Sequence, residues 1–424
     1  MSNNNPTGIN GHGAKNYPDD EILMASLFQY AKERLGTAQR LARLEAEHNL
    51  VIKDQTLYKL NRKFKVPSVR RPPPDDIATQ AVLEKVANDP SQRRGVGTIS
   101  TLLSNEGVAI PRDFIRNVLA TYAPEGLARR FPGVNRIPRS KLSALGPNHQ
   151  HHADGHEKLN AQALNMGGVG LNIYGVKDQW SSYILHLVVV PNNRLATTIG
   201  HVYLDAVEKY ELIPITFVTD KGSETGFLYA NQTALREAYA PEIDKEQFPP
   251  MLQMRSVHNT PIEGLWHWFL QTFGHNIKDT IRSGFELGIY NPNNSVHPQL
   301  FYWLWPKILQ IQLDQFVEYW NNHRIRAQAD KPNMSGSTPR HAFTVPDLPA
   351  QQCGITVDQA VIDALRHQIP VSRKDSMRWV DDEFEVAATM AFSSIGEPPL
   401  SNLLSGWKIF TSMARVINVA SSST

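Results

Sequence analysis

The chain has 424 residues, of which 41% are hydrophobic and 20% charged, a composition typical of an ordinary soluble protein with two or three domains. A single cysteine excludes an internal disulfide framework and suits a reducing compartment, and no apolar run reaches the roughly 18 residues that a membrane-spanning helix needs. The net charge is +2, but residues 1–150 carry 22 Lys and Arg against 14 Asp and Glu, whereas the remainder carries 21 against 27. The amino-terminal third is therefore the better candidate for binding phosphate, and the remainder for a site built from carboxylates.

Residues 1–18 are predicted to form a disordered tail, and their polar composition excludes a secretory signal. Residues 19–71 are predicted to form three short helices, with Thr37 and Asp54 as N-caps of the second and third. The third helix and its flanks gather cations that we predict to bind DNA: Lys53, Lys59, Arg62, Lys63, Lys65, Arg70 and Arg71. A three-helix unit that ends in a basic helix is typical of a helix-turn-helix DNA reader. The same cations also fit a solvated surface face, and that alternative stays open.

Residues 72–130 repeat the arrangement of short helices separated by a Gly-containing turn, with Pro111 predicted as the first residue of the last helix. Two consecutive modules of this kind favour DNA binding, and the alternative is a helical bundle used for oligomerisation. Residues 131–150 are rich in Pro, Gly and Arg without periodicity, which predicts a linker.

The segment 151–345 alternates short β-rich runs with longer helical periods. Asp154 lies in the first run, HHADGHEKL, and the runs LNIYGV and SSYILHLVVV follow it. A helical stretch then leads to PITFVTD, which ends at Asp220, and Glu263 lies in the later stretch SVHNTPIEGLW. This order predicts a mixed sheet covered by helices, with three carboxylates that come from separate elements and meet in space. The aromatic residues of the two long helices that follow are predicted to be core.

Each of the three acids has a structural alternative. Asp220 at the end of a strand also fits a turn residue, and Glu263 also fits a capping box in which Thr260 is the N-cap and Pro261 the first helical residue. The histidines around Asp154 suggest zinc, but the lack of cysteine ligands and the carboxylates downstream argue against it. Asp178 fits a hairpin turn better than a metal ligand.

Taken together, these motifs resemble the ribonuclease H-like catalytic core of the DDE recombinases, which include retroviral integrases and cut-and-paste transposases. In that fold the first acid lies on the first strand, the second follows the fourth strand, and the glutamate lies on a later helix, as Asp154, Asp220 and Glu263 would. The resemblance extends to Gly222 in DKGSE and to the motifs YWNNHR and GSTPRHAF, and it covers about residues 150–345. The chain departs from retroviral members in a longer gap between the last two acids and in the absence of their zinc-binding amino end.

The resemblance implies a ribonuclease H-like core with a mixed five-stranded sheet, and a site where the three acids bind two Mg²⁺ ions, which Mn²⁺ can replace. Asp154 would contact both ions, while Asp220 and Glu263 would each complete one. Supporting roles are expected for Glu224 around the metal ligands and for His258 and Asn259 beside the attacking oxygen or the scissile phosphate. Two further residues would either hold the DNA backbone or tie the last helix to the core: Asn322 and Arg324.

We therefore interpret the chain as a DDE integrase or transposase that nicks DNA and transfers strands, acting on element ends and target DNA as a homo-oligomer without membrane contact. The alternatives are a captured element protein that binds DNA without catalysis and a ribonuclease H-like nuclease without strand transfer. Residues 346–424 are expected to form an accessory region with one helix near GITVDQAVIDALRHQIP and a strand pair in RWVDDEFEVAATMAF. In a eukaryote, a DNA substrate implies a nuclear location.

Overall fold

A computed structural model of the chain describes residues 17–123, 144–254, 259–327 and 335–421. Most of the predicted tail and most of the predicted linker lie outside these ranges. Within them, no helix has the length and the apolar character that crossing a membrane requires.

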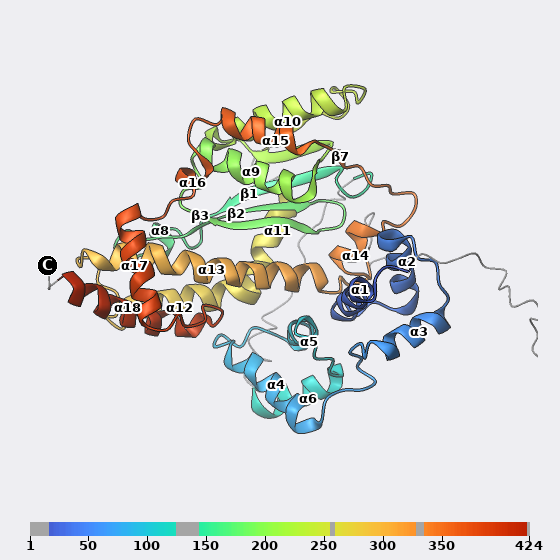
Figure 1. Cartoon of the computed structure of the whole chain (residues 1–424), viewed down its shortest axis with the longest axis horizontal. Helices are drawn as coiled ribbons and strands as arrows, with labels where there is room; N and C mark the ends of the chain where they lie inside the picture. Colours follow the sequence, from blue (N-terminus) through green and yellow to red (C-terminus); the bar gives the residue numbers. More distant parts are fainter. Residues whose placement is uncertain (1–16, 124–143, 255–258, 328–334, 422–424) are drawn as a thin grey trace, which may run out of the picture.

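The centre of the molecule is a five-stranded sheet with the strand order β3-β2-β1-β5-β6 (Figure 1). Its strands are β1 (Gln150–His156), β2 (Asn172–Asp178), β3 (Ile184–Val190), β5 (Thr216–Asp220) and β6 (Met251–Met254). The β1–β2 and β2–β3 pairs are antiparallel, whereas β1–β5 and β5–β6 are parallel. The predicted mixed five-stranded sheet of a ribonuclease H-like core is therefore confirmed.

Helices cover both faces of this sheet, because successive strand side chains point to opposite sides. Ile173 on β2 packs into one hydrophobic core and its neighbour Tyr174 packs into the other. The core around Ile173 is closed by α11 (Thr260–Phe269), α12 (His275–Glu286) and α13 (Val296–Asn322). The core around Tyr174 is closed by α9 (Ala196–Tyr210), α10 (Gly226–Tyr239) and α15 (Gln359–Gln368).

The aromatic residues of the long helix α13 lie inside the first core. Trp303, Trp305 and Phe316 are all buried there, which confirms their interpretation as packing residues. The preceding helices α11 and α12 are joined by a π-helical turn at Leu270–Gly274. The first of the two predicted long helices is therefore one helical stretch, residues 260–286, with a widened turn.

The amino-terminal region is all-helical, as predicted, and consists of two units with separate cores. The first contains α1 (Asp20–Lys32), α2 (Thr37–His48) and α3 (Asp54–Lys63), and the second contains α4 (Asp75–Ala87), α5 (Val96–Asn105) and α6 (Arg112–Tyr122). Thr37 and Asp54, predicted as N-caps, are instead the first residues of α2 and α3, after the N-caps Gly36 and Lys53. Pro111, predicted as the first helical residue, is the N-cap of α6. Asp54 instead places its carboxylate in the first turn, where the helix dipole favours negative charge.

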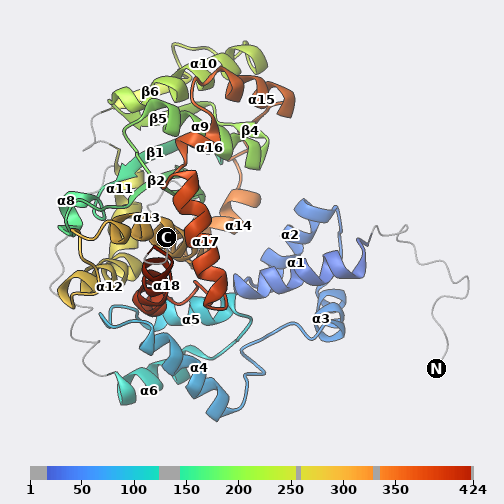
Figure 2. The same ribbon diagram turned by 60° about the vertical axis from the view of Figure 1, so that its left-hand side comes forward.

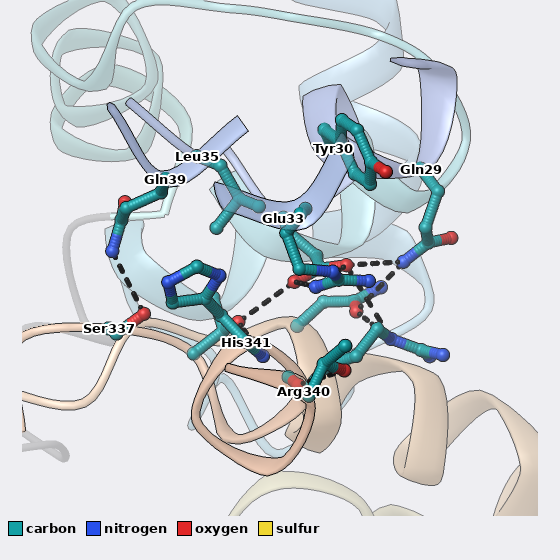
Figure 3. Close-up of polar contacts among 12 residues, drawn as sticks. Gln29, Tyr30, Glu33, Leu35, Gln39, Ser337, Arg340 and His341 are labelled. Carbon is teal, nitrogen blue, oxygen red and sulfur yellow. Dashed lines mark hydrogen bonds and ion pairs between the residues drawn. The ribbon is translucent and has the colours of Figure 1, made fainter. Parts of the chain in front are cut away.

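A buried polar network holds the first helical unit against α13 and the segment that follows it (Figure 3). Glu33, at the end of α1, is completely buried and forms an ion pair of 3.0 Å with Arg43 of α2. The same carboxylate accepts a hydrogen bond of 2.9 Å from the hydroxyl of Thr338, which precedes α14 (Pro339–Thr344). Arg340 lies 3.7 Å from Glu33 and donates to Asn322 at the end of α13. The GSTPRHAF motif therefore contacts the amino-terminal region as well as the core.

The second helical unit is held by separate contacts. Asn276 of α12 accepts a hydrogen bond from the Ser91 amide at 3.1 Å and donates one to the buried carboxylate of Asp89 at 2.9 Å. Arg94 lies over the ring of Phe273 at 4.7 Å and donates to the carbonyl of Thr272 at 3.3 Å. Both amino-terminal units are thus packed against the helical layer of the core (Figures 1 and 2).

The carboxyl-terminal region, drawn in orange and red in Figure 2, runs along the outside of the core. The predicted helix in this region is α15, but the predicted strand pair is wrong, because most of that stretch forms α17 (Asp382–Ser394). Asp381 caps α17 by accepting a hydrogen bond of 2.8 Å from the Phe384 amide, and Ala388 and Ala391 pack into the core. The last helix, α18 (Gly406–Ser421), buries Phe410 and Met413 in the same core as α13.

We predict that Glu33→Ala lowers the free energy of unfolding by about 3 kcal/mol, because it leaves the buried guanidinium of Arg43 without one of its two carboxylate partners. The control Asp20→Asn removes an exposed ion pair with Lys63 and should cost less than about 1 kcal/mol. Denaturant unfolding of the full chain measures both. Equal effects of the two substitutions would contradict an anchoring role for Glu33.

Candidate active site

A cavity of about 710 Å³ opens at the edge of the sheet where β1, β5 and α11 come together. It is lined by all three predicted acids, Asp154, Asp220 and Glu263, together with Glu224 and Tyr174. The structure therefore brings together side chains that are separated by up to 109 positions in the sequence. The three acids converge because Asp154 lies on β1, and the elements that carry Asp220 and Glu263, β5 and α11, pack directly against β1.

Strand register places the two aspartates side by side. The last pair of the parallel β1–β5 ladder is His152 with Val218, and Asp154 and Asp220 each follow this pair by two residues. Residues two apart on a strand share a face, so both carboxylates project from the same side of neighbouring strands. Asp220 is the last residue of β5, and its backbone also pairs with Met254 of β6.

Asp154 is the most strongly perturbed of the three acids. One of its oxygens accepts a hydrogen bond of 2.7 Å from the Gly155 amide and the other accepts one of 3.0 Å from the indole N–H of Trp266. The pKa of Asp154 is raised to about 7, chiefly by burial and also by the negative charges of Asp220 and Glu263, although its two hydrogen bonds act in the opposite direction. This cavity is therefore an environment in which added positive charge would be stabilised.

Asn259 ties Asp220 to β1. Its amide nitrogen donates to the Asp220 carboxylate at 3.1 Å and to the Ala153 carbonyl at 3.2 Å, and its amide oxygen lies 2.7 Å from Nδ1 of His152. Burial lowers the pKa of His152, so a neutral ring that carries its proton on Nδ1 donates to Asn259. Sequence reasoning named Asn259 for contact with substrate, but in this structure it is buried and orients a carboxylate.

Glu263 lies in the first turn of α11 with its side chain exposed toward the cavity. The capping-box alternative for this residue is wrong. Helix α11 begins at Thr260, its N-cap residue is Asn259, and no side-chain hydrogen bond caps it. Thr260 therefore does not act as the N-cap, and the position of Glu263 is not explained by capping.

Trp266 is a site residue that sequence reasoning assigned only to packing. It is three residues after Glu263, which puts both on one face of α11, and this spacing is the signal that could have found it. The ring of His156 stacks on the indole at 4.8 Å. Gly175, the β2 residue paired with Asp154, leaves room for the indole, because a Cβ atom there would lie 2.8 Å from it.

The remaining predicted residues lie in different surroundings. Glu224 is on a short 3₁₀ turn at Ser223–Thr225 and lines the cavity, whereas His258 lies outside the described residues. Asn322 is buried and bonds to Asn105, Gln29, Glu318 and Arg340, which favours the structural role over DNA contact.

Two further positions complete the comparison with the sequence. Arg324 is exposed and donates to the Gly336 carbonyl at 3.0 Å. Asp178 accepts hydrogen bonds from the amide and the hydroxyl of Ser181 in the turn between β2 and β3, at 2.7 and 2.6 Å, which confirms its prediction as a hairpin residue.

The donor set fits magnesium better than zinc. Within the described ranges, no group of three His, Cys, Asp or Glu side chains is close enough to hold one metal ion. A two-ion site spreads its carboxylates over two cations about 3.5–4 Å apart, so its ligands need not converge on one point. The cavity presents carboxylate oxygens, the hard ligands that Mg²⁺ prefers, and the raised pKa of Asp154 shows mutual repulsion that such cations would offset.

We predict that Gly175→Ala lowers the free energy of unfolding by about 1–3 kcal/mol, because the added methyl group would collide with Trp266 and Leu187. The matched control is Gly264→Ala on α11, where a Cβ atom meets nothing within 4 Å and should stabilise the helix by about 0.5–1 kcal/mol. Denaturant unfolding followed by tryptophan fluorescence measures both. A neutral Gly175→Ala would show that the indole position is not constrained by β2.

Comparisons with known proteins agree with this geometry. Residues 142–344 match the family model described as the integrase core domain. A search of curated proteins finds no match. Among solved structures, a chain of the simian T-cell lymphotropic virus intasome in complex with PP2A regulatory subunit B56 gamma shares 14% identity over 59% of this chain and 72% of its own, with a TM-score of 0.29.

Two complexes of the Mos1 transposase also match: the paired-end complex with the left transposon end, at a TM-score of 0.17, and a pre-cleavage transpososome, at 0.15. Each shares 11% identity over 64% of this chain and 97% of its own. TM-scores this low carry no argument about the arrangement of the whole chain. The family match and the sheet order agree with each other: residues 142–344 match the integrase core domain, and we conclude that the described residues of this range have a ribonuclease H-like fold.

Proposed function

We propose that this protein is a DDE integrase or transposase that nicks DNA and joins the resulting end to target DNA. The observation that carries the proposal is that Asp154, Asp220 and Glu263, from three separate elements, line one cavity and interact electrostatically. Asp154 lies within β1, Asp220 ends β5 and Glu263 lies in the first turn of α11, yet all three line the same cavity.

Asp154, Asp220 and Glu263 would hold two Mg²⁺ ions, with Asp154 between them. When bound, the ions would supply positive charge to the attacking and leaving oxygens of a phosphodiester. The chain itself prepares the ligands: Trp266 and Gly155 fix the direction of the Asp154 carboxylate, and Asn259 fixes that of Asp220. Such hydrogen bonds to metal ligands pre-organise a site before its cations bind.

The same site can serve both reactions because they differ only in the attacking oxygen. With water, the new bond to phosphorus breaks the bond to the 3′ oxygen and leaves a free 3′ hydroxyl. With that hydroxyl as the nucleophile, its oxygen bonds to a target phosphorus and displaces the target's own 3′ oxygen, which leaves as a hydroxyl, so the strand is joined to the target. The cationic side chains of Lys158, Arg194 and Lys221 also line the cavity, where they could contact DNA phosphates.

The amino-terminal helical units would supply DNA binding. All seven cations predicted for this role are exposed, which leaves them available to phosphate groups, and only Lys63 among them forms an ion pair, with Asp20. Pairing of two element ends would require a homo-oligomer. DNA as the substrate would place the protein in the nucleus of a eukaryote.

We predict that Asp220→Asn and Glu263→Gln each abolish Mg²⁺-dependent nicking and joining while leaving the fold intact, because each removes a charge that the cations need. The control Glu237→Gln, on the exposed surface of α10 and paired with Lys245, should keep full activity. The assay uses labelled duplexes that carry the repeats flanking the gene, with Mg²⁺ or Mn²⁺, and follows both cut and joined products.

The same assay separates the alternatives. A captured regulator would shift the duplex in a gel without cutting it, and a nuclease would cut without producing joined strands. Activity that survives in both Asp220→Asn and Glu263→Gln would contradict the proposed triad.

We also predict that Trp266→Phe raises the Mg²⁺ concentration needed for half-maximal nicking by about 10- to 100-fold, because it removes a donor that orients Asp154. Phenylalanine keeps most of the packing, so the unfolding midpoint should change little. Titration calorimetry with Mg²⁺ provides an independent reading of the same loss. An unchanged Mg²⁺ requirement would show that the indole serves only the hydrophobic core.

A further inference from the structure

A second cavity, of about 490 Å³, lies between the first helical unit and the connection from α5 to α6. Its walls come from α1, α2, α3 and the segment 66–71 on one side and from Ser104, Gly107 and Ala109 on the other. The side chains that line it include six cations: Lys32, Arg34, Arg40, Arg62, Arg70 and Arg71. No aspartate or glutamate is among the described residues that line it, so the cavity concentrates positive charge.

One of these cations, Arg34, lies in surroundings that disfavour its positive charge. Its guanidinium donates to the hydroxyls of Ser100 at 2.8 Å and Thr101 at 2.7 Å, which are neutral acceptors. Burial, together with repulsion from Arg112 and Arg324, lowers the pKa of Arg34 to about 10. Arg34 is half-buried, and a partly desolvated cation that lies near other cations is stabilised when an anion joins it.

Arg40, on α2, lies in a similar environment. It donates to the Leu35 carbonyl at 2.9 Å and to the amide oxygen of Asn61 at 3.4 Å, again without a carboxylate. Burial lowers the pKa of Arg40 as well. By contrast, the nearby Arg43 is neutralised by Glu33 and Glu47, so the fold does pair buried arginines where their role is structural.

The backbone of Arg34 adds a separate observation. The residue has a φ of 56° and occupies the left-handed position that ends α1, where the Leu35 amide bonds to the Tyr30 carbonyl and the Arg34 amide to the Ala31 carbonyl. Glycine is strongly favoured at this position of a helix end, since it has no Cβ atom. This backbone conformation fixes the point at which the Arg34 side chain leaves the end of α1.

We propose that this cavity binds a phosphate group, with Arg34 and Arg40 as its principal contacts and the exposed arginines Arg62, Arg70 and Arg71 around its mouth. A planar guanidinium presents paired N–H donors that match phosphate oxygens, and one phosphate group within reach of both arginines would offset their positive charge. The bound phosphate would also join the two amino-terminal units, because both contribute walls. It belongs either to the backbone of DNA or to a free phosphate compound. The site is distant in sequence from the carboxylate triad and is tested without any cutting reaction.

The first experiment measures thermal unfolding of the full chain in tripolyphosphate, with chloride at matched ionic strength as reference. We expect tripolyphosphate to raise the midpoint of the wild type by a few degrees and to have no such effect on Arg34→Gln/Arg40→Gln. In phosphate-free buffer the double variant should be as stable as the wild type or more so, because the removed charges have no carboxylate partner.

Two further variants separate binding from packing. Arg116→Gln on α6 removes an exposed arginine that is paired with Asp113 and does not line the cavity, so it should respond to tripolyphosphate like the wild type. Arg34→Lys/Arg40→Lys restores the charge and should recover part of the response, which a packing defect would not. No stabilisation of the wild type beyond chloride, or a full response in the Gln double variant, would overturn the proposal.

The second experiment identifies the source of the phosphate by measuring the affinity for a short duplex of arbitrary sequence at several salt concentrations. If the site holds a DNA phosphate, the Gln double variant should bind more weakly at every sequence, and the slope of log affinity against log salt should fall by about 1, as expected for the loss of one phosphate contact. If it holds a free phosphate compound, DNA affinity stays unchanged while the tripolyphosphate response is lost. A wild type that responds to tripolyphosphate yet never cuts DNA would refute the proposed catalysis and leave this site standing.

Discussion

The parallel pairing of β1 with β5 is the constraint on which the candidate site depends. It fixes Asp154 and Asp220 on one face of neighbouring strands, where two like charges repel each other and one of them lies in a poorly solvated position. The fold stabilises this arrangement with neutral donors, since Trp266, the Gly155 amide and Asn259 each bond to an aspartate. Among the described residues, no basic side chain forms an ion pair with either aspartate, which favours the binding of cations.

Charge is handled differently where the helical units meet the core. Glu33 and Arg43 are both buried, and the fold pairs them with each other and with Thr338, so the charges cancel and the contact becomes a specific anchor. Arg34 and Arg40, only a few residues away in sequence, are half-buried and form no ion pair with a described carboxylate. The charge of Arg43 is thus neutralised by carboxylates, whereas Arg34 and Arg40 contact neutral acceptors. We interpret the first as a structural contact and the second as the phosphate site proposed above.

The carboxyl-terminal region packs into the same core as the sheet, although the sequence places it outside the core segment. Helices α17 and α18 bury their apolar faces in the core that α13 shares with the sheet, and β7 (Ile355–Thr356) pairs with β4 (Leu212–Ile213) beside α9. Removal of these elements would expose Trp305 and Phe316 side chains that cannot be solvated cheaply. The integrase core domain here is therefore stabilised by chain on both sides of it in the sequence.

The sequence by itself determined the strand and helix order of the core, because hydrophobic periodicity is a local property, and its resemblance to the DDE recombinases named the three acids that line the cavity. It also determined that the aromatic stripe of α13 is core. Only the tertiary structure decided that α17 is a helix, where acidic residues next to apolar ones suggested strands, because the apolar face has a core to cover. The start of α11 at Thr260, the bond from Trp266 to Asp154, and the partial burial of Arg34 and Arg40 likewise depend on which distant elements meet, and no local pattern contains that information.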